Sequence, residues 1–157
     1  MQELYRVVDV EPYIMTGDDD YVTGTLTCYL EDGSEIILYN VPYDITLAIA
    51  RLKELDESEI YEPDDFRDTV YGILIMFLPK LKALGESIEK VVIDDFDDEN
   101  MVYKASLYIT TDGISIRRTM IPSHAIFLAL LFNKPVFVTK EIAEMSRNLE
   151  EEDEEEI

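Results

Sequence analysis

The sequence predicts an α+β domain with a mainly antiparallel sheet of hairpins and helices packed against it. Apolar and polar residues alternate in residues 21–30 and 101–111, which is typical of strands with one buried face. An Asp-Gly pair follows each of these strands, at Asp32-Gly33 and Asp112-Gly113, and such pairs favour the tight type I′ turn of a hairpin. A returning strand, a proline and an apolar helical pattern come next in both places.

The two hairpins also suggest an internal duplication. Nine positions separate Gly33 from Pro42 and Gly113 from Pro122, so the two copies are offset by 80 residues. We therefore predict a hairpin-proline-helix unit that occurs twice and packs about an approximate pseudo-twofold axis. The alternative is that common turn residues match by chance.

The other elements of the first half follow from the same patterns. Residues 4–14 alternate as a strand, with the even-numbered residues from Leu4 to Val10 on one face. Residues 34–41 form the returning strand. Asp44 can then cap a helix whose apolar residues repeat at three and four positions, as one buried stripe requires.

A long helix is predicted after the acidic segment 56–62. Asp64 and Asp65 suit its positive end, Gly85 closes it, and Pro79 should bend or divide it. Its apolar residues occupy two sides, so one side should face the sheet and the other a second subunit. The alternative is a helix buried on all sides in a single core.

The second half ends in two helices. A strand over residues 87–95 opens this half, and the helix after its proline carries no charge, so it should be buried nearly all round. Ser123 suits the N-cap of that helix, and Asn133 suits its end. Thr139 can cap a final helix that runs through Arg147.

The acidic composition divides into a domain and a tail. The chain of 157 residues has a formal net charge of −22, and residues 150–156 are all carboxylates. Such a run repels itself, so we predict one folded domain over residues 1–147 and a disordered acidic tail over residues 148–157. The charge on the domain still disfavours broad affinity for nucleic acid, which depends on Lys and Arg.

Membrane segments and cysteine chemistry are both disfavoured. No run approaches the roughly 20 apolar residues that span a bilayer. The first residues lack the features of a signal peptide, so we expect a cytoplasmic location and no membrane partner. Cys28 is the single cysteine, which excludes a disulfide or a thiolate metal cluster within one chain.

Four segments carry a resemblance to a known family. They are Val91-Val92-Ile93-Asp94-Asp95-Phe96, Tyr103-Lys104-Ala105, Pro122-Ser123-His124-Ala125-Ile126 and Pro135-Val136-Phe137-Val138. In this order they resemble the bifunctional nuclease family, whose usual pattern includes an Arg-Pro-Ser-Asp-Ala-Ile helix start. The resemblance runs over roughly residues 4–145. It implies an α+β domain that tends to self-associate and, in some members, nuclease activity on DNA and RNA.

The chain departs from the family pattern at its polar positions. Ile121 stands where the family has Arg before Pro-Ser, and His124 stands where it has Asp. Glu62-Pro63 replaces an Arg-Pro pair before the long helix, and the His-Asp expected soon afterwards has no His here. The acidic position of the first helix aligns with Ile45, one place after Asp44. These replacements bear directly on catalytic competence.

A divalent metal ion is the cofactor that a nuclease resemblance implies. Phosphodiester hydrolysis usually uses clustered carboxylates that hold one or two such ions, here Mg²⁺, Mn²⁺ or Ca²⁺. Asp95, Asp97 and Glu99 have the alternate spacing of a calcium loop, but Asn100 and Ser106 stand where Gly and Glu are needed. We interpret that cluster as a solvated turn.

Three residues remain as candidates for chemistry: His124, Ser123 and Asp44. In the first turn of a buried helix, the helix dipole favours a neutral imidazole, which can accept a proton or bind a metal ion. If the duplication holds, Asp44 lies at the equivalent helix start, so the two residues could converge. The competing interpretations are a local hydrogen bond for His124 and a helix cap for Ser123.

Two functions are therefore predicted. The first is a metal-assisted nuclease acting on DNA or RNA, which rests on the family resemblance. The second is a non-catalytic module that forms homo-oligomers and binds a protein partner, which the two-sided helix and the acidic tail favour.

Overall fold

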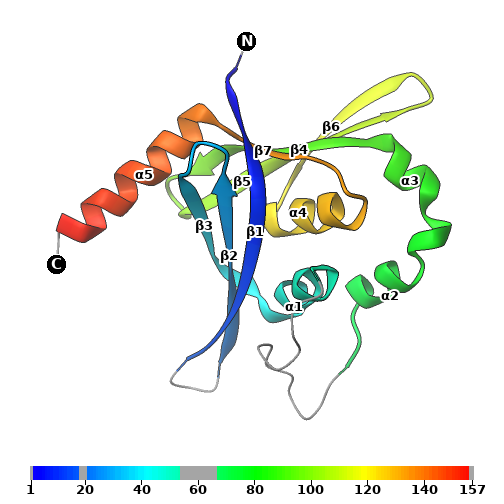
Figure 1. Cartoon of the computed structure of the whole chain (residues 1–157), viewed down its shortest axis with the longest axis horizontal. Helices are drawn as coiled ribbons and strands as arrows, with labels where there is room; N and C mark the ends of the chain where they lie inside the picture. The colour runs from blue at the N-terminus through cyan, green and yellow to red at the C-terminus, as the bar shows by residue number, and fades with distance from the viewer. Residues whose placement is uncertain (1, 18–20, 54–66, 156–157) are drawn as a thin grey trace.

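The structure, a computed structural model, describes residues 2–17, 21–53 and 67–155. Figure 1 shows a sheet with helices packed against it, which confirms the α+β prediction. The strands are β1 (Leu4–Thr16), β2 (Val22–Leu30), β3 (Glu35–Pro42), β4 (Ile88–Asp97), β5 (Val102–Thr111), β6 (Ile114–Met120) and β7 (Val136–Thr139). The helices are α1 (Tyr43–Leu52), α2 (Val70–Met76), the 3-10 turn η2 (Leu78–Lys80), α3 (Lys82–Ser87), α4 (Pro122–Leu131) and α5 (Lys140–Glu155).

The seven strands form one mixed sheet in the order β3-β2-β1-β7-β4-β5-β6. Every neighbouring pair is antiparallel except β4 and β7, which are parallel. The short β7 pairs with β1 only over Leu4 to Arg6, and with β4 over Val91 to Ile93. It therefore joins two antiparallel three-stranded units into a single sheet.

These two units repeat the same order of elements. β2 and β5 begin 80 residues apart, and the pairs β3/β6 and α1/α4 begin 79 apart. Because β1 is antiparallel and β4 is parallel to β7, β1 and β4 run in opposite directions, as a twofold axis normal to the sheet requires. The hairpin-proline-helix unit predicted from the sequence is present twice.

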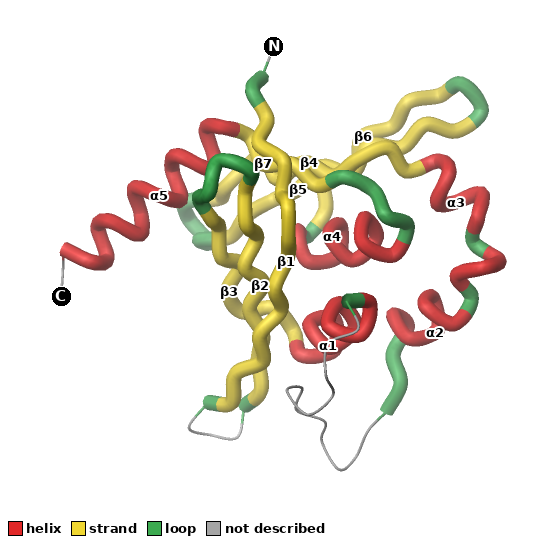
Figure 2. Tube along the Cα trace, viewed as in Figure 1, coloured by secondary structure: helices red, strands yellow, loops and turns green. Residues whose placement is uncertain are grey.

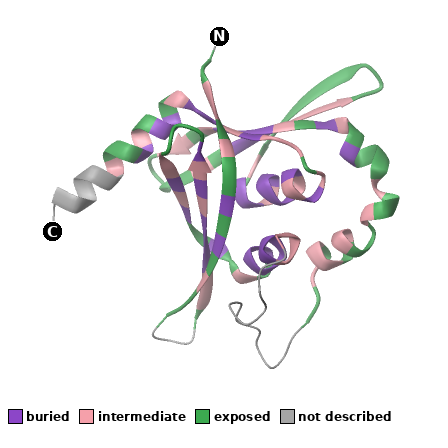
Figure 3. Ribbon diagram, viewed as in Figure 1, coloured by how far each residue is buried: buried purple, intermediate pink, exposed green. Residues whose placement is uncertain are grey.

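The core lies between the sheet and helices α1 and α4, which pack against each other on one face (Figures 1 and 3). No residue of α4 is exposed, as its uncharged sequence predicts. Helix α5 adds Ile142 and Ala143 to the same core cluster. In the described part of the chain, no helix is long and apolar enough to cross a membrane.

Strand β1 departs from the predicted alternation. Its register shifts between Val7 and Asp9, so an extra residue bulges at Val8. Tyr5 and Val7 pack on the core before the bulge and Val10 is buried after it, whereas Val8 is 61% exposed. The prediction that the even-numbered residues from Leu4 to Val10 share one face was therefore wrong, because a bulge moves the following side chains to the opposite face.

The two hairpin turns differ in type. Asp112 and Gly113 have φ of 50° and 77°, so the predicted type I′ turn is confirmed there. At the first hairpin only Gly33 has a positive φ, 89°, and the loop is longer, with Leu30 N–H donating to the Ser34 carbonyl. The type I′ prediction was wrong at this turn, where Asp32 Oδ1 instead accepts the Ser34 N–H at 3.0 Å.

The helix ends confirm some of the predicted caps and correct others. Pro42 and Ile121 occupy the N-cap positions of α1 and α4, without side-chain cap bonds, so the capping roles predicted for Asp44 and Ser123 were wrong. The helices start earlier because proline provides a φ suited to a helix start. Asn133, with a φ of 56°, ends α4 as predicted. Thr139 Oγ1 accepts the Ile142 N–H at 3.2 Å and caps α5.

The long helix predicted over residues 64–85 is divided. Its predicted start at Asp64 and Asp65 lies outside the described residues, and α2 begins at Val70. The short 3-10 turn that contains Pro79 then separates α2 from α3. The division at Pro79 is as predicted, because proline lacks the N–H that would continue the helix.

Helix α5 continues beyond its predicted end. It runs to Glu155 rather than Arg147, so the backbone of most of the predicted disordered tail is helical. Glutamate has a favourable helix propensity, and neither Gly nor Pro follows Arg147 to stop the helix. The predicted boundary of this helix was therefore wrong.

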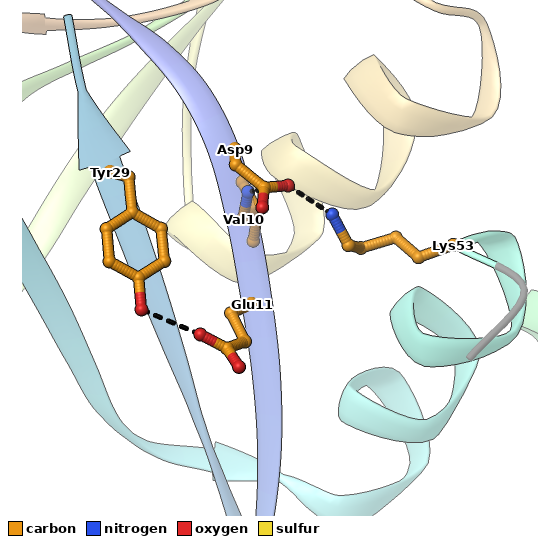
Figure 4. Close-up of polar contacts among 5 residues, drawn as sticks. All are labelled: Asp9, Val10, Glu11, Tyr29 and Lys53. Carbon is orange, nitrogen blue, oxygen red and sulfur yellow. Dashed lines mark hydrogen bonds and ion pairs between the residues drawn. The ribbon is translucent and has the colours of Figure 1, made fainter. Parts of the chain in front are cut away.

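Polar side-chain contacts join the middle of β1 to neighbouring elements (Figure 4). The Asp9 carboxylate pairs with the Lys53 ammonium group at the end of α1. The Tyr29 hydroxyl donates to Glu11 Oε2 at 2.7 Å, and this bond, with burial and nearby carboxylates, raises the pKa of Tyr29 to about 12. Both contacts join β1 to another element of the first unit.

Gly24 should be required for the packing of α1 on β2. A Cβ at Gly24 would lie 2.1 Å from Thr46 Oγ1, and Thr46 is fully buried with its hydroxyl donating to the Pro42 carbonyl. We expect Gly24→Ala to lower the free energy of unfolding by about 1–3 kcal/mol, measured by urea denaturation, because the helix must shift. Gly17→Ala is the control, since its Cβ would meet only ordinary contact at 3.5 Å. Equal stability of the two variants would contradict the prediction.

Candidate active site beside helices α1, α2 and α4

The sequence-predicted residues lie at the starts of two packed helices. Asp44 is exposed in the first turn of α1, where its Oδ1 accepts the Ile45 N–H at 2.8 Å. His124 is half-buried in the first turn of α4. Ser123 is only 3% exposed, so it faces the protein interior and is poorly placed to attack a substrate.

Tyr71 of α2 links the two helix starts. Its hydroxyl lies 3.3 Å from His124 Nε2, at hydrogen-bond distance. The two rings meet edge to face with centroids 5.9 Å apart, and the Tyr71 ring also contacts Phe127 at 5.1 Å. The phenol is therefore fixed against α4 by both polar and aromatic contacts.

The electrostatics of Tyr71 connect it to Asp44. Burial raises the pKa of Tyr71, and the negative charge of Asp44 raises it further. The phenol thus stays protonated at neutral pH and can donate its proton to a neutral imidazole. Tyr71 thus lies at hydrogen-bond distance from His124 and responds to the charge of Asp44, whereas the convergence of Asp44 and His124 themselves stays a prediction.

A hollow of about 390 Å³ opens beside this cluster, between α1 and the segment that leads into α2. Its charged lining consists of Asp44 and Arg51 from α1, and Arg67 and Asp68 from the following segment. The remaining lining residues are Tyr43, Leu47, Ala48, Thr69, Gly72 and Ile75. Two arginines balance two aspartates here, so the hollow is much less negative than the chain as a whole.

Local sequence explains how these groups reach the hollow. Asp44, Ala48 and Arg51 are spaced by four and three residues, so they share one face of α1. Asp68 Oδ1 accepts the Thr69 N–H at 2.8 Å and lies against Gly72. A Cβ at Gly72 would come within 2.0 Å of that oxygen, so glycine makes room for the carboxylate.

A second hollow, of about 270 Å³, lies on the opposite face of the sheet over β4, β5 and β6. It is lined by Gln2, Asp94, Asp95, Lys104, Ser106, Arg117 and Thr119. The buried Ser106 hydroxyl donates to Asp94 Oδ2 at 2.7 Å, which fixes that carboxylate. This hollow contains none of the predicted site residues.

The carboxylates of the β4–β5 turn do not form a metal site. Asp97 accepts the N–H of Glu99 at 2.9 Å and the side-chain amide of Asn100 at 2.7 Å. The contacts with Asn100, followed by the other contacts of the turn, lower the pKa of Asp97. In the described ranges, no group of three or more His, Cys, Asp or Glu side chains could hold a metal ion. The interpretation of this cluster as a solvated turn agrees with both observations.

Comparison with known proteins identifies the family. The bifunctional nuclease domain matches residues 74–150, from within α2 to α5, which supports membership of the bifunctional nuclease family. Ser123 and His124 lie inside the matched region, whereas Asp44 and Tyr71 precede it. No curated protein matches the chain.

Sequence reasoning missed four residues of this region: Tyr71, Arg51, Arg67 and Asp68. Arg51 could have been found, since it lies seven residues after Asp44 on the same helix face. Nothing local marks Tyr71, because its partners are 27 and 53 residues away in sequence. Its role follows only from the packing of α2 beside α1 and α4.

Removing the Tyr71 hydroxyl should change the environment of His124 without unfolding the protein. We expect Tyr71→Phe to lower the free energy of unfolding by about 0.5–1.5 kcal/mol, the usual net value of one hydrogen bond, and to shift the His124 imidazole ¹⁵N resonances. Because His124 is the single histidine, those NMR signals are unambiguous. Tyr39→Phe, at a side chain that is 68% exposed, is the control. Identical imidazole spectra in both variants would show that the Tyr71–His124 contact does not form.

Proposed function

We propose that this member of the bifunctional nuclease family hydrolyses phosphodiester bonds of DNA or RNA at the hollow between α1 and α2. The observation that carries the proposal is a hollow lined by Asp44 and two arginines, next to α2, whose Tyr71 lies at hydrogen-bond distance from His124 and responds to the charge of Asp44. Family membership supplies the reaction class, and the side chains in the hollow supply the groups that such a reaction needs.

Arg51 and Arg67 are suited to bind the substrate phosphate. The guanidinium group presents several N–H donors in a plane that matches phosphate oxygens, so it holds the group in one orientation. The two residues come from α1 and from the segment before α2, and both line the same hollow. Asp44 lines the same hollow, and α2, which contributes Gly72 and Ile75 to its lining, also carries the Tyr71 that contacts His124.

His124 is the proton-transfer group in this proposal, and Tyr71 is its positioning residue. A phenol that donates to Nε2 fixes both the orientation and the tautomer of the imidazole, because the proton must then reside on Nδ1. Displacement of that hydrogen bond by substrate frees Nε2 to accept a proton from water or to return one to the leaving oxygen. Ser123 has no part in this scheme because it is buried.

The described carboxylates fit a loosely held divalent ion. Asp44 and Asp68 each use one oxygen for a backbone N–H, and no described hydrogen bond involves the other oxygen of either carboxylate. Mg²⁺ commonly binds through one or two carboxylates and completes its shell with water and substrate phosphate, so these two residues would hold it. Such an ion, when bound, neutralises negative charge on the phosphate and activates water.

The net charge of −22 sets the conditions under which such activity should appear. A strongly acidic protein repels a polyanion, so the affinity for nucleic acid should be weak and should improve when divalent cations screen both partners. The reaction should therefore favour short, single-stranded substrates, in which fewer phosphates lie near acidic surface.

A cleavage assay tests the proposal. Purified protein is incubated with single- and double-stranded DNA and RNA in Mg²⁺, Mn²⁺ or Ca²⁺, with and without a chelator. We expect chelator-sensitive cleavage, a fall in kcat of about a hundredfold or more in His124→Ala, and a rise in KM in Arg67→Ala. Lys82→Ala is the control, because this exposed lysine lies on α3. Failure to cleave under every condition, or full activity of His124→Ala, would overturn the proposal.

A second candidate function, self-association, is favoured by α2 and α3. None of the seven residues of α2 is buried, although all of them except one tyrosine and one glycine are aliphatic. The exposed apolar residues here define the α2–α3 surface: Val70, Ile73, Met76, Phe77 and Leu84, with exposed fractions of 41–64%. Apolar residues gathered on one surface mark a place for a partner.

The charge around the α2–α3 surface favours a second copy of the chain as that partner. Residues 69–85 contain no Asp or Glu and two lysines, Lys80 and Lys82, in a chain with a net charge of −22. Two copies can therefore approach through this surface with little of the repulsion that other acidic surfaces produce. This agrees with the homo-oligomer expected from the two-sided apolar pattern.

The oligomeric state tests this second candidate. We expect the wild-type chain to sediment as a dimer or larger species and Ile73→Asp/Phe77→Asp to sediment as a monomer, because buried unpaired carboxylates oppose association. Ile114→Asp is the matched control, since this residue is 60% exposed at the β5–β6 hairpin. A wild-type chain that stays monomeric at high concentration would contradict the candidate.

A further inference from the structure

We propose that the outer edge of β6 binds an extended acidic peptide of another protein, which adds to the sheet as a further strand. β6 is the last strand in the sheet order and pairs with β5 alone. Backbone N–H and C=O groups on its other side are therefore available to a peptide in the manner of β-strand addition. The proposal is independent of the α1–α2 hollow, which lies on other elements.

The β6 edge is open along its full length. Six of its seven residues are exposed, and β5 is the only described element with which it makes extensive contacts. The β5–β6 hairpin projects away from the helices (Figures 1 and 2). The other end of the sheet differs, because β3 contacts α5 and is interrupted by Asn40, with a φ of 56°, and by Pro42.

The charge on β6 indicates what the peptide must carry. Arg117 and Arg118 are the only adjacent basic pair in the chain, and neither forms an ion pair within the described residues. As neighbours on a strand they point to opposite faces of the sheet. Carboxylates on two consecutive peptide residues would therefore meet one arginine on each face.

The residues around the two arginines indicate which peptide side chains should lie next to the two carboxylates. Arg117 lines the 270 Å³ hollow together with Lys104, Asp94 and Asp95, so two carboxylates balance the two cations there and the preference for an acidic side chain depends on Arg117 itself. On the other face, Ile116 and Ile114 precede Arg118 along the strand toward the hairpin turn, and they are 38% and 60% exposed. β-branched apolar residues of the peptide would cover these isoleucines. In antiparallel order the motif reads acidic, acidic, apolar.

A second copy of the chain does not fit this edge. Antiparallel pairing of β6 with itself, centred on the arginines, would place Arg117 and Arg118 against the same residues of the partner. Like charges directly opposite each other destabilise a strand pair. The same arginines that repel another β6 attract a peptide with two carboxylates, so the edge discriminates between the two occupants.

Two labelled peptides with the same β-branched flanks test the proposal, one with two adjacent glutamates and one with two lysines. Fluorescence anisotropy with the full chain should give a Kd at least about tenfold lower for the glutamate peptide. Arg117→Glu/Arg118→Glu should reverse this preference and bind the lysine peptide instead. Lys140→Glu/Arg147→Glu changes the net charge equally on α5, at side chains that are 44% and 50% exposed, and should leave the preference unchanged.

Backbone pairing is tested separately from charge. Methylation of the alternate peptide nitrogens that face β6 should weaken binding about tenfold or more, whereas methylation of the outward nitrogens should not. Circular dichroism shows whether both double variants fold. If the glutamate variant of the β6 arginines does not fold, Arg117→Gln/Arg118→Gln replaces it, and this variant should lose the preference for the glutamate peptide. Arginines that only protect the edge from aggregation would bind neither peptide. Three results would overturn the proposal: binding of neither peptide, equal binding of both peptides, or binding that methylation does not weaken.

Discussion

The fold depends on the pairing of β7 with both halves of the chain. Its four residues bond to β1 on one side and to β4 on the other, and two of them, Val136 and Val138, are buried. Each half alone is a three-stranded antiparallel unit with one apolar helix, which leaves an uncovered side of that helix. Once β7 joins the halves, α1 and α4 cover each other, so one continuous core replaces two incomplete ones.

The same joining brings the candidate site together. Because a proline stands at the start of each helix, close to the end of an equivalent strand, their first turns belong to corresponding parts of the two units. Tyr71 then reaches His124 from α2, and its pKa responds to Asp44. The arginines of the adjacent hollow offset its aspartates, in a chain that is otherwise strongly negative. The polar hollow lies between α1 and the segment that leads into α2.

The α2–α3 surface and the β6 edge are suited to different kinds of partner. The α2–α3 surface is apolar and free of carboxylates, which suits contact with an identical acidic chain. The β6 edge offers unpaired backbone groups but carries an arginine pair, which disfavours contact with itself and favours a short acidic strand. If both proposals hold, charge separates self-association from binding of a different partner, although both surfaces have apolar residues available for contact.

The sequence by itself determined the elements whose causes are local. Alternation specified β2 and β5, the uncharged run specified the buried α4, Pro79 divided the long helix, and Asn133 and Thr139 marked helix ends, because propensity and capping act within a few residues. The family resemblance and the duplicated unit were also visible in sequence order. Only the tertiary structure decided the bulge in β1, the burial of Ser123, the exposure of α2 and the place of Tyr71 beside His124. Each of these depends on residues far apart in the chain, whose distances are set by how the sheet closes over its helices.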